Sequence, residues 1–418
     1  MSQWSFTLTY RDYDSARDLK AVTRIWKEVG WIQDEAKDAD RVDIFFRTAA
    51  DALVATIDDV AECAVVATDG TIKYQQETLQ LGAVTAVTTS RVARKLGFAG
   101  DLTARLLARQ ATAGKELAAL GMFEQGFYDK LGFGTGAYEQ WIRFDPATLT
   151  VSHPFRPPRR LGIDDYPAIH QAMCNRLPAH GSVTIVPPEL IKAELAWTDE
   201  PFGLGYFDGP DGTLSHFIWG SAKGEHGPYT ITWRAWQSAE QLLELLALIR
   251  SLGDQVTQVS MLEMAEIQLQ DLLKQPFRHR RLTRGGDFAN RSNSFAYWQM
   301  RILDLPACIE RTHLNTPTVR FNLALTDPVE AYLDDSHNWR GISGNYIVTL
   351  GESSEAVVGT DPRLPTLSAS VGAFTRLWFG IRPASSLAIT DSLSADPGLL
   401  RQLDNSLKLA PAHLGWDF

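Results

Sequence analysis

Apolar residues recur along the chain with two different spacings, which together predict a mixed α+β protein. Residues 14–29 place Leu19, Val22, Ile25 and Trp26 on one face, the three-to-four-residue spacing of an amphipathic helix. Apolar runs of strand length follow, separated by turn signals. Strands are predicted at residues 52–56, 64–68 and 79–89, then a helix at 101–116 and a last strand near 138–144.

A Pro- and Arg-rich stretch at residues 153–160 indicates a linker, and the same kinds of pattern begin again after it. The elements predicted there are a helix, three strands and a strongly apolar helix, at residues 164–176, 204–207, 216–221, 229–237 and 238–252. Ser238 and Gln241 predict a capping box at the start of the last helix.

The pattern changes again from about residue 300. Residues 319–325 alternate strictly between apolar and polar side chains, as in a half-buried strand. Further strands at 345–350 and 356–360 and helices at 364–380 and 399–407 complete the prediction. The three stretches predict domains at residues 1–152, 153–300 and 301–418.

Composition narrows the class of protein. A hydrophobic content of 44% in 418 residues is ample for several cores, and a formal charge of −10 argues against a nucleic-acid partner. The same charge suits a cationic substrate. Three scattered cysteines and nine histidines show no ligand spacing, so we predict neither disulfides nor a bound metal. The absence of a signal-like or membrane-length apolar run predicts a cytoplasmic protein without membrane attachment.

A basic turn between the strand at 79–89 and the helix at 101–116 is the first candidate site. It contains Arg94, Lys95 and Gly97, and the free N–H groups of a following helix would favour an anion there. The alternative is an ordinary strand-to-helix turn with solvated basic side chains.

A second stretch, Phe127-Tyr128-Asp129-Lys130-Leu131-Gly132-Phe133, follows about thirty residues later. Together the two stretches resemble the Gcn5-related N-acetyltransferase (GNAT) family. The resemblance implies that the first motif binds the pyrophosphate of acetyl-CoA and that Tyr128 lies beside the thioester sulfur. It also implies a set of cofactor contacts. These are Val87, Thr88 and Thr89 to the pantetheine amides, Arg94, Lys95, Leu96, Gly97, Phe98, Ala99 and Gly100 to the pyrophosphate, and Phe123 and Glu124 to the rest of the cofactor.

The later parts of the chain extend the resemblance. The turn at residues 235–238 has no glycine, which predicts a second GNAT-like domain without cofactor binding, or else an unrelated α+β domain. Residues 366–371 and 377–380 resemble sterol-carrier-like domains. Two GNAT-like domains followed by such a domain resemble the enhanced intracellular survival (Eis) family, which acetylates amines such as those of aminoglycosides. That family forms hexamers, so the resemblance implies a homo-oligomer.

The candidate chemistry follows from what amine acylation requires. No Asp or Glu lies between residues 82 and 90, so a general base must come from elsewhere. The resemblance implies that the base is the carboxylate of the last residue, Phe418, and that Glu28 binds a cationic amine; the alternative for Glu28 is a solvated helix face. Asp417, beside Phe418, would add a second negative group for such an amine. Tyr128 is the candidate acid, since a phenol can protonate a leaving thiolate; the alternative is a core tyrosine.

The function predicted from the sequence is therefore acetyl-CoA-dependent transfer of an acetyl group to a primary amine of a cationic substrate. Aminoglycoside-, polyamine- and lysine-like amines all fit. Two alternatives stay open: a carrier of lipid or another ligand, and a regulatory protein that senses acetyl-CoA through relic GNAT domains.

Overall fold

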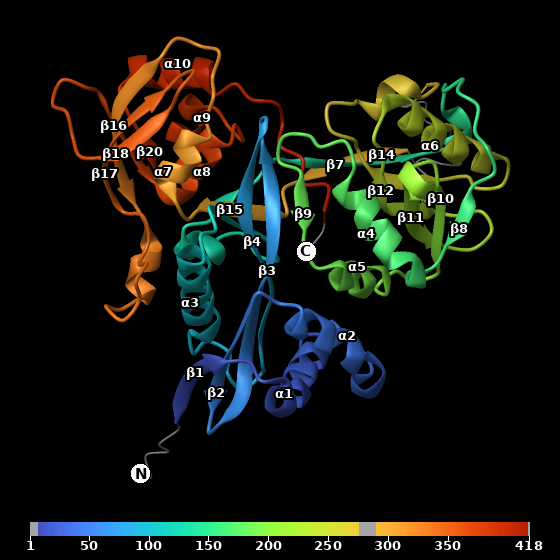
Figure 1. The fold of residues 1–418 in the computed structure, drawn as a ribbon, viewed down its shortest axis with the longest axis horizontal. Helices are drawn as coiled ribbons and strands as arrows, with labels where there is room; N and C mark the ends of the chain where they lie inside the picture. The colour runs from blue at the N-terminus through green and yellow to red at the C-terminus, as the bar shows by residue number, and fades with distance from the viewer. Residues whose placement is uncertain (1–6, 276–289, 417–418) are drawn as a thin grey trace. The chain divides into compact units, whose positions relative to one another are not determined.

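The computed structural model describes residues 7–275 and 290–416, and the chain forms two compact units (Figure 1). The first unit combines residues 1–137 with 180–186 and 297–418, and the second combines 138–179 with 187–296. Each unit collects segments that are distant in sequence, so their borders differ from those predicted near residues 152 and 300.

The first unit is built on an eight-stranded sheet in the order β1-β2-β3-β4-β5-β15-β6, with β9 also paired to β3. Its strands are β1 (Leu8–Asp12), β2 (Asp51–Ile57), β3 (Val60–Tyr74), β4 (Glu77–Thr89), β5 (Leu117–Gly121), β6 (Gly134–Thr135), β9 (Val183–Ile185) and β15 (Trp298–Ile302). β3 and β4 form one long antiparallel hairpin, whereas β4 and β5 are parallel and joined through a helix.

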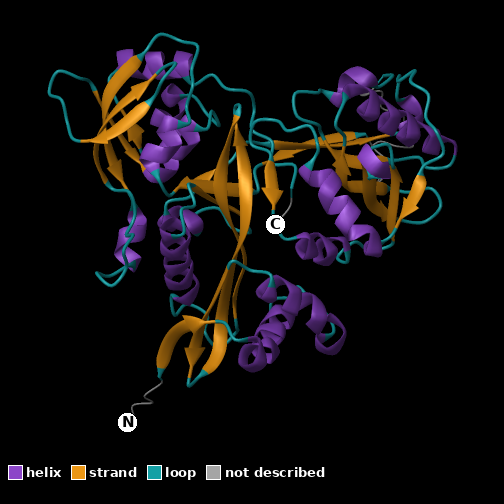
Figure 2. Cartoon of the chain, in the orientation of Figure 1, coloured by secondary structure: helices purple, strands orange, loops and turns teal. Residues whose placement is uncertain are grey.

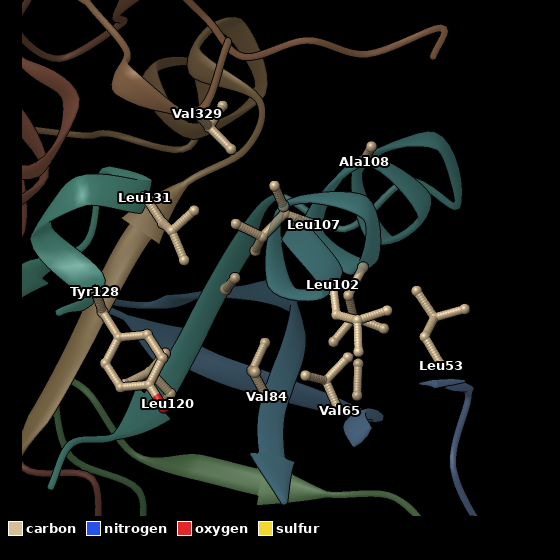
Figure 3. Close-up of a cluster of buried hydrophobic side chains, with 14 of the residues drawn as sticks. Leu53, Val65, Val84, Leu102, Leu107, Ala108, Leu120, Tyr128, Leu131 and Val329 are labelled. Carbon is tan, nitrogen blue, oxygen red and sulfur yellow. The ribbon is translucent and has the colours of Figure 1, made fainter. Parts of the chain in front are cut away.

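Helices cover both faces of this sheet, with α1 (Ser15–Glu28) and α2 (Glu35–Arg47) on one side and α3 (Phe98–Thr112) on the other (Figures 1 and 2). Successive side chains of a strand point to opposite faces of the sheet, so each face packs against its own helices. Val65 of β3 packs in one cluster with Leu102 and Leu107 of α3 (Figure 3). Cys63 of β3 belongs to the same cluster. The helix predicted at residues 14–29 is confirmed as α1, whose N-cap Asp14 accepts a hydrogen bond from the Ala16 N–H.

One predicted strand lies in a different sheet from the one expected. Residues 138–144 were expected to close the first domain, but β7 (Glu139–Phe144) pairs with β13 and β14 in the sheet of the second unit. Its place beside β5 is taken by β15, which follows β14 in the sequence. Sequence periodicity predicts a strand but not its partner, so it could not reveal this exchange.

The second unit repeats the topology of the first sheet. Its strands, in the order β14-β7-β13-β12-β11-β10-β8, are again antiparallel except for the pair β12–β13, which α6 connects. The remaining bounds are β8 (Arg159–Leu161), β10 (Pro201–Tyr206), β11 (His216–Ala222), β12 (Tyr229–Ala235), β13 (Val259–Leu262), β14 (Arg291–Phe295), α4 (Tyr166–Cys174), α5 (Pro188–Leu195) and α6 (Ala239–Ser251). This repeat supports a second GNAT-like fold.

The C-terminal part of the first unit has its own five-stranded sheet, in the order β18-β17-β16-β19-β20. Its elements are β16 (Val319–Thr326), β17 (Gly344–Leu350), β18 (Glu355–Val358), β19 (Thr366–Ser370), β20 (Leu393–Ser394), α7 (Leu305–Glu310), α8 (Val371–Trp378), α9 (Ala384–Thr390) and α10 (Pro397–Ser406), with a 3₁₀ helix η7 (Pro328–Tyr332). The helix predicted over residues 364–380 is wrong in its first part, because β19 pairs in parallel with β16 and only then does α8 begin.

The chain after α10 packs against β9 of the first sheet. The N–H of His413 donates to the carbonyl of His180 at 2.9 Å, and the N–H of Val183 donates to the carbonyl of Leu414 at 2.9 Å. Both contacts advance in the same direction, so the tail runs parallel to β9. Leu414 and Trp416 are buried, which fixes the tail as far as the last described residue.

Candidate active site

The strands β4 and β5 separate from each other at the centre of the first sheet. Their parallel pairing ends at Val84 and Leu120, whereas β4 continues to Thr89. A β-bulge lies at this point, where Ala86 adopts a φ of 54° and the register with β3 shifts. Within the described part of the chain, no strand pairs with the β5 side of β4 beyond Val84. That edge is therefore available to the amides of an extended ligand.

The three residues predicted to pair with pantetheine all lie on this part of β4. Val87 and Thr89 are partly exposed, whereas Thr88 is 4% exposed and its hydroxyl donates to the Ala86 carbonyl at 3.3 Å. The Thr89 hydroxyl lies 3.3 Å from the Cys63 sulfur. The backbone of β4, rather than the Thr88 side chain, is thus the part that can reach a ligand.

The basic loop leads directly into α3, which begins at Phe98, three residues earlier than predicted. Arg94, Lys95 and Leu96 are exposed, and Gly97 is the N-cap with a φ of 88° and no side chain to cap the helix. An L-residue rarely adopts this φ, which explains the glycine. The N–H groups of the first turn, at Phe98, Ala99 and Gly100, lack intrahelical acceptors and form an anion-binding end.

Gly100 has a structural reason of its own to be glycine. A Cβ at this position would lie 3.1 Å from the ring of Tyr332, at the end of η7. The C-terminal domain therefore touches the first turn of α3, a contact that no sequence pattern indicated. Tyr10 is a second partner of this turn, because its hydroxyl donates to the Asp101 carboxylate at 2.6 Å.

The corresponding helix of the second unit is capped differently. Ser238 is the N-cap of α6 and its hydroxyl accepts from the N–H of Gln241 at 3.4 Å, as the predicted capping box requires. The reciprocal bond is shifted by one residue, since the Gln241 side chain accepts from Gln237 instead. With its first-turn donors partly satisfied and no glycine in the turn, α6 offers a poorer anion site than α3.

Tyr128 begins the 3₁₀ helix η1 (Tyr128–Leu131) and is 2% exposed. Its ring points from η1 toward Leu120 of β5 (Figure 3). The ring also packs edge-on against Phe127, with ring centroids 4.9 Å apart. Among the described residues, none forms a hydrogen bond with its hydroxyl. Burial raises the pKa of Tyr128 above its usual value near 10, so the phenol stays protonated at neutral pH.

Phe123 and Glu124 follow β5 on an exposed loop. Phe123 is 73% exposed, yet its ring centroid lies 6.0 Å from that of Tyr128 in an edge-on arrangement. A large apolar side chain exposed beside the tyrosine is available to contact a ligand. Glu124 is exposed as well.

Glu28, predicted to bind substrate, ends α1 and contacts the loop after β4. Its carboxylate accepts from the N–H of Arg91 at 2.8 Å and lies 4.0 Å from Arg24. One oxygen is thus already used to fix the loop. Glu62 lies close by and pairs with Arg24 at 3.0 Å. Sequence reasoning missed Glu62 because it stands within an apolar run with nothing to single it out.

Asp417 and Phe418 lie outside the described residues, so their predicted roles rest on the resemblance and on the course of the tail before them. The tail follows β9, which is antiparallel to β3 and pairs with Gly70 to Ile72. At His413 and Leu414 the chain therefore runs in the direction of β9, which passes from Ile72 to Gly70 of β3.

Asp208, His216 and Glu244 of the second unit have the ligand types of a metal site, with ligand atoms within 4.8 Å of one another. Arg156 already supplies the positive charge, however, since its guanidinium lies 2.6 Å from Asp208 and 2.8 Å from Glu244. Hydrogen bonds from Arg156 lower the pKa of Glu244 to about 2. We therefore interpret the cluster as a structural ion-pair network.

A cavity of about 500 Å³ lies behind η1, between the first sheet and the C-terminal domain of the same unit. Its lining is mostly polar and includes Asp129, Thr135, Glu330, Ser370 and Arg376. Such a lining does not suit a lipid tail, which requires apolar walls.

Comparisons with known proteins agree with this geometry. Residues 10–136 match the family profile of the acetyltransferase (GNAT) domain. No curated protein matches the sequence. The profile match shows that the chain contains an acetyltransferase domain of the GNAT type, and such domains are acyltransferases.

Solved structures resemble the whole chain in fold. A conserved protein of unknown function from Enterococcus faecalis V583 matches with a TM-score of 0.78 and 17% identity, over 99% of this chain and 100% of that one. A GCN5-related N-acetyltransferase from Kribbella flavida gives 0.75 and 17%, over 99% of each chain. Eis1 from Mycobacterium abscessus gives 0.74 and 15%, over 99% and 100%. The whole chain thus has the α+β architecture of GNAT-fold acetyltransferases.

No helix in the described ranges, 7–275 and 290–416, has the length and apolarity needed to cross a membrane.

Proposed function

We propose that this chain, whose residues 10–136 form a GNAT acetyltransferase domain, transfers an acetyl group from acetyl-CoA to a primary amine of a cationic substrate. The observation that carries the proposal is the Tyr128 hydroxyl. It is held in a buried ring beside the opening between β4 and β5, and the fold does not use it for any hydrogen bond among the described residues. Aminoglycoside-, polyamine- and lysine-like amines are the substrate classes that fit the acidic chain.

The site offers a place for each part of acetyl-CoA. The pantetheine amides would pair with the free edge of β4, and the pyrophosphate would lie at the N-terminus of α3 with Arg94 and Lys95 beside it. This arrangement would direct the thioester toward Tyr128. The second unit lacks the glycine turn, so we propose one cofactor site per chain.

The chemistry is a direct transfer. The amine nitrogen attacks the thioester carbonyl, the carbon–sulfur bond breaks, and the departing thiolate takes the proton of the Tyr128 hydroxyl. Because burial raises the pKa of Tyr128, the phenol still carries its proton when the sulfur leaves. The amine proton passes to a base, so charge and atoms balance.

We propose that the base is the carboxylate of Phe418. The buried tail up to Trp416 supports this, because backbone hydrogen bonds to His180 and Val183 hold the chain in place at His413 and Leu414. An α-carboxylate with a pKa of about 3.5 needs burial or acidic neighbours to become basic enough. Glu28 is the second candidate, although one of its oxygens already accepts from Arg91.

The other roles follow from this assignment. Asp417 and Glu28 would attract the cationic amine, and the C-terminal domain, which resembles sterol-carrier-like domains, would deliver the terminus. We also propose that the protein binds acetyl-CoA and acts in the cytoplasm. We propose further that it assembles into a homo-oligomer such as a hexamer.

The experiment is a thiol-release assay with acetyl-CoA and a panel of aminoglycosides, polyamines and lysine peptides. We expect turnover with at least one amine, and a fall of about 10²–10⁴-fold in kcat for Tyr128→Phe, with acetyl-CoA affinity nearly unchanged. Tight acetyl-CoA binding without turnover of any amine would instead support a sensing role. A Tyr128→Phe enzyme with normal kcat would remove this residue from the mechanism.

A further inference from the structure

A buried ion pair stands directly behind the turn that carries Tyr128. It joins Arg301 of β15 to Asp327, the residue after β16, and both side chains are 0% exposed. The guanidinium is bidentate, with Nη2 2.5 Å from Oδ2 and Nη1 3.2 Å from Oδ1. The planar fork of arginine fixes the direction of such a pair as well as its distance.

Arg301 also contacts the turn itself. Its Nη1 donates to the carbonyl of Leu131, the last residue of η1. The turn closes through a bond from the Phe133 N–H to the Tyr128 carbonyl at 3.2 Å. Gly132, with a φ of 82°, lies so close that a Cβ would be 2.8 Å from the same Nη1. A displaced guanidinium would therefore move the end of the turn.

Asp327 is itself fixed by the C-terminal domain. Its carboxylate accepts from the N–H groups of Val329 at 3.2 Å and Ile342 at 3.0 Å, and its own N–H donates to the Ser343 hydroxyl at 2.7 Å. The ring of Trp339 lies 5.1 Å from the guanidinium. The C-terminal domain thus sets the position of the Arg301 guanidinium, because the hydrogen bonds of Asp327 leave the carboxylate little freedom to move.

Stability alone does not account for this pair, because a buried ion pair contributes little more than an apolar pair of the same volume. The pair instead fixes the direction in which the Arg301 guanidinium points. We infer that Arg301 and Asp327 are positioning residues for acetyl transfer, holding η1 so that the Tyr128 hydroxyl meets the departing sulfur. The inference rests on the proposed role of Tyr128, and it assigns the C-terminal domain a part in catalysis beyond its own fold.

The test compares two changes in the full chain, each made in two backgrounds. Arg301→Met with Asp327→Leu removes the pair without leaving one buried charge unpaired. Leu323→Ala, in the core of the same C-terminal sheet, is the control for lost stability. Both changes are made with Tyr128 present and with Tyr128→Phe. kcat and KM for acetyl-CoA are measured by thiol release with an amine from the panel, alongside the thermal midpoint.

We expect the pair replacement to lower kcat at least about tenfold with KM for acetyl-CoA nearly unchanged, since a small misplacement of a reacting group is costly. In the Tyr128→Phe background the same replacement should change kcat less than about twofold, because residues that act as one unit are not additive. The alkaline limb of kcat should also move to lower pH, toward the ordinary phenol pKa near 10, as water reaches the loosened ring.

Two outcomes overturn the inference while leaving the acid role of Tyr128 intact: equal loss of kcat in both backgrounds, or a loss no greater than that of Leu323→Ala. Normal kcat in Tyr128→Phe would overturn both together. Should the pair replacement not fold, Arg301→Lys serves as the second variant. It keeps a charge opposite Asp327 but cannot also maintain the fork and the bond to Leu131, so the same non-additive loss is expected.

Discussion

Gly132 offers a stringent test of the packing behind the tyrosine turn, through Gly132→Ala. Its φ of 82° lies in the left-handed region, and a Cβ there would be 2.5 Å from Cγ1 of Val371, 2.8 Å from Nη1 of Arg301 and 3.1 Å from Oδ1 of Asp327. The valine is stiff and the arginine is held by its hydrogen bonds, so neither atom can move at low cost.

A matched control separates the two contributions to the loss of stability in Gly132→Ala, the backbone strain and the steric overlap. Gly114→Ala has the same φ of 82°, but nothing lies within 4 Å of its Cβ position. Gly114→Ala should therefore change the free energy of unfolding only through the backbone. The left-handed conformation costs about 1–2 kcal/mol, and the less flexible unfolded chain offsets about 0.4–1 kcal/mol of that cost. Gly132→Ala should add overpacking of about 1–3 kcal/mol.

The assay is denaturant unfolding of the two variants and the parent, followed by tryptophan fluorescence, with kcat measured in parallel. Gly132→Ala should lower the unfolding midpoint clearly more than Gly114→Ala and should also reduce kcat, because the turn must shift. Equal midpoints for the two variants would show that η1 does not pack against Arg301 and Val371 as described.

Three further outcomes are expected. Extending the chain beyond Phe418, or amidating it, should lower kcat about 10²-fold or more while a tag of the same length before Met1 does not; an unaffected rate would move the base elsewhere, with Glu28 tested next. Gly97→Val should abolish acetyl-CoA binding by calorimetry, because valine resists a φ of 88°, whereas Gly114→Val, at 82° and beyond the opposite end of α3, should not. Glu244→Gln should be less stable than the parent at pH 7, and the difference should vanish as the pH falls from about 4.5 to about 2, since a carboxylate with a lowered pKa stabilises only while ionised; a difference that persists at pH 2 would contradict the ion-pair interpretation.

Local patterns were sufficient wherever one segment decides its own structure. The apolar stripe of residues 14–29 predicted α1, and Ser238 predicted the cap of α6, because helix periodicity and capping depend on neighbours within one or two turns. The pairing of a glycine turn with a later tyrosine likewise indicated an acetyltransferase domain, which the family profile over residues 10–136 supports.

Tertiary structure alone decided what depends on partners distant in sequence. Residues 139–144 read as a strand in either sheet, and only pairing with β13 and β14 assigned them to the second unit. Residues 366–370 were predicted as the start of a helix, yet they form β19 and pair in parallel with β16. Propensity is a weak determinant when a sheet edge needs backbone hydrogen bonds.

The surroundings of Tyr128 show the same division. The sequence alone selected Tyr128 and Gly97, since their chemistry and backbone freedom are properties of single residues. It did not indicate Arg301, Asp327 or Tyr332, because each acts through a contact with a residue more than 160 positions away or on another domain. A buried arginine has no sequence signature; only the fold brings the carboxylate and the carbonyl that make its burial possible.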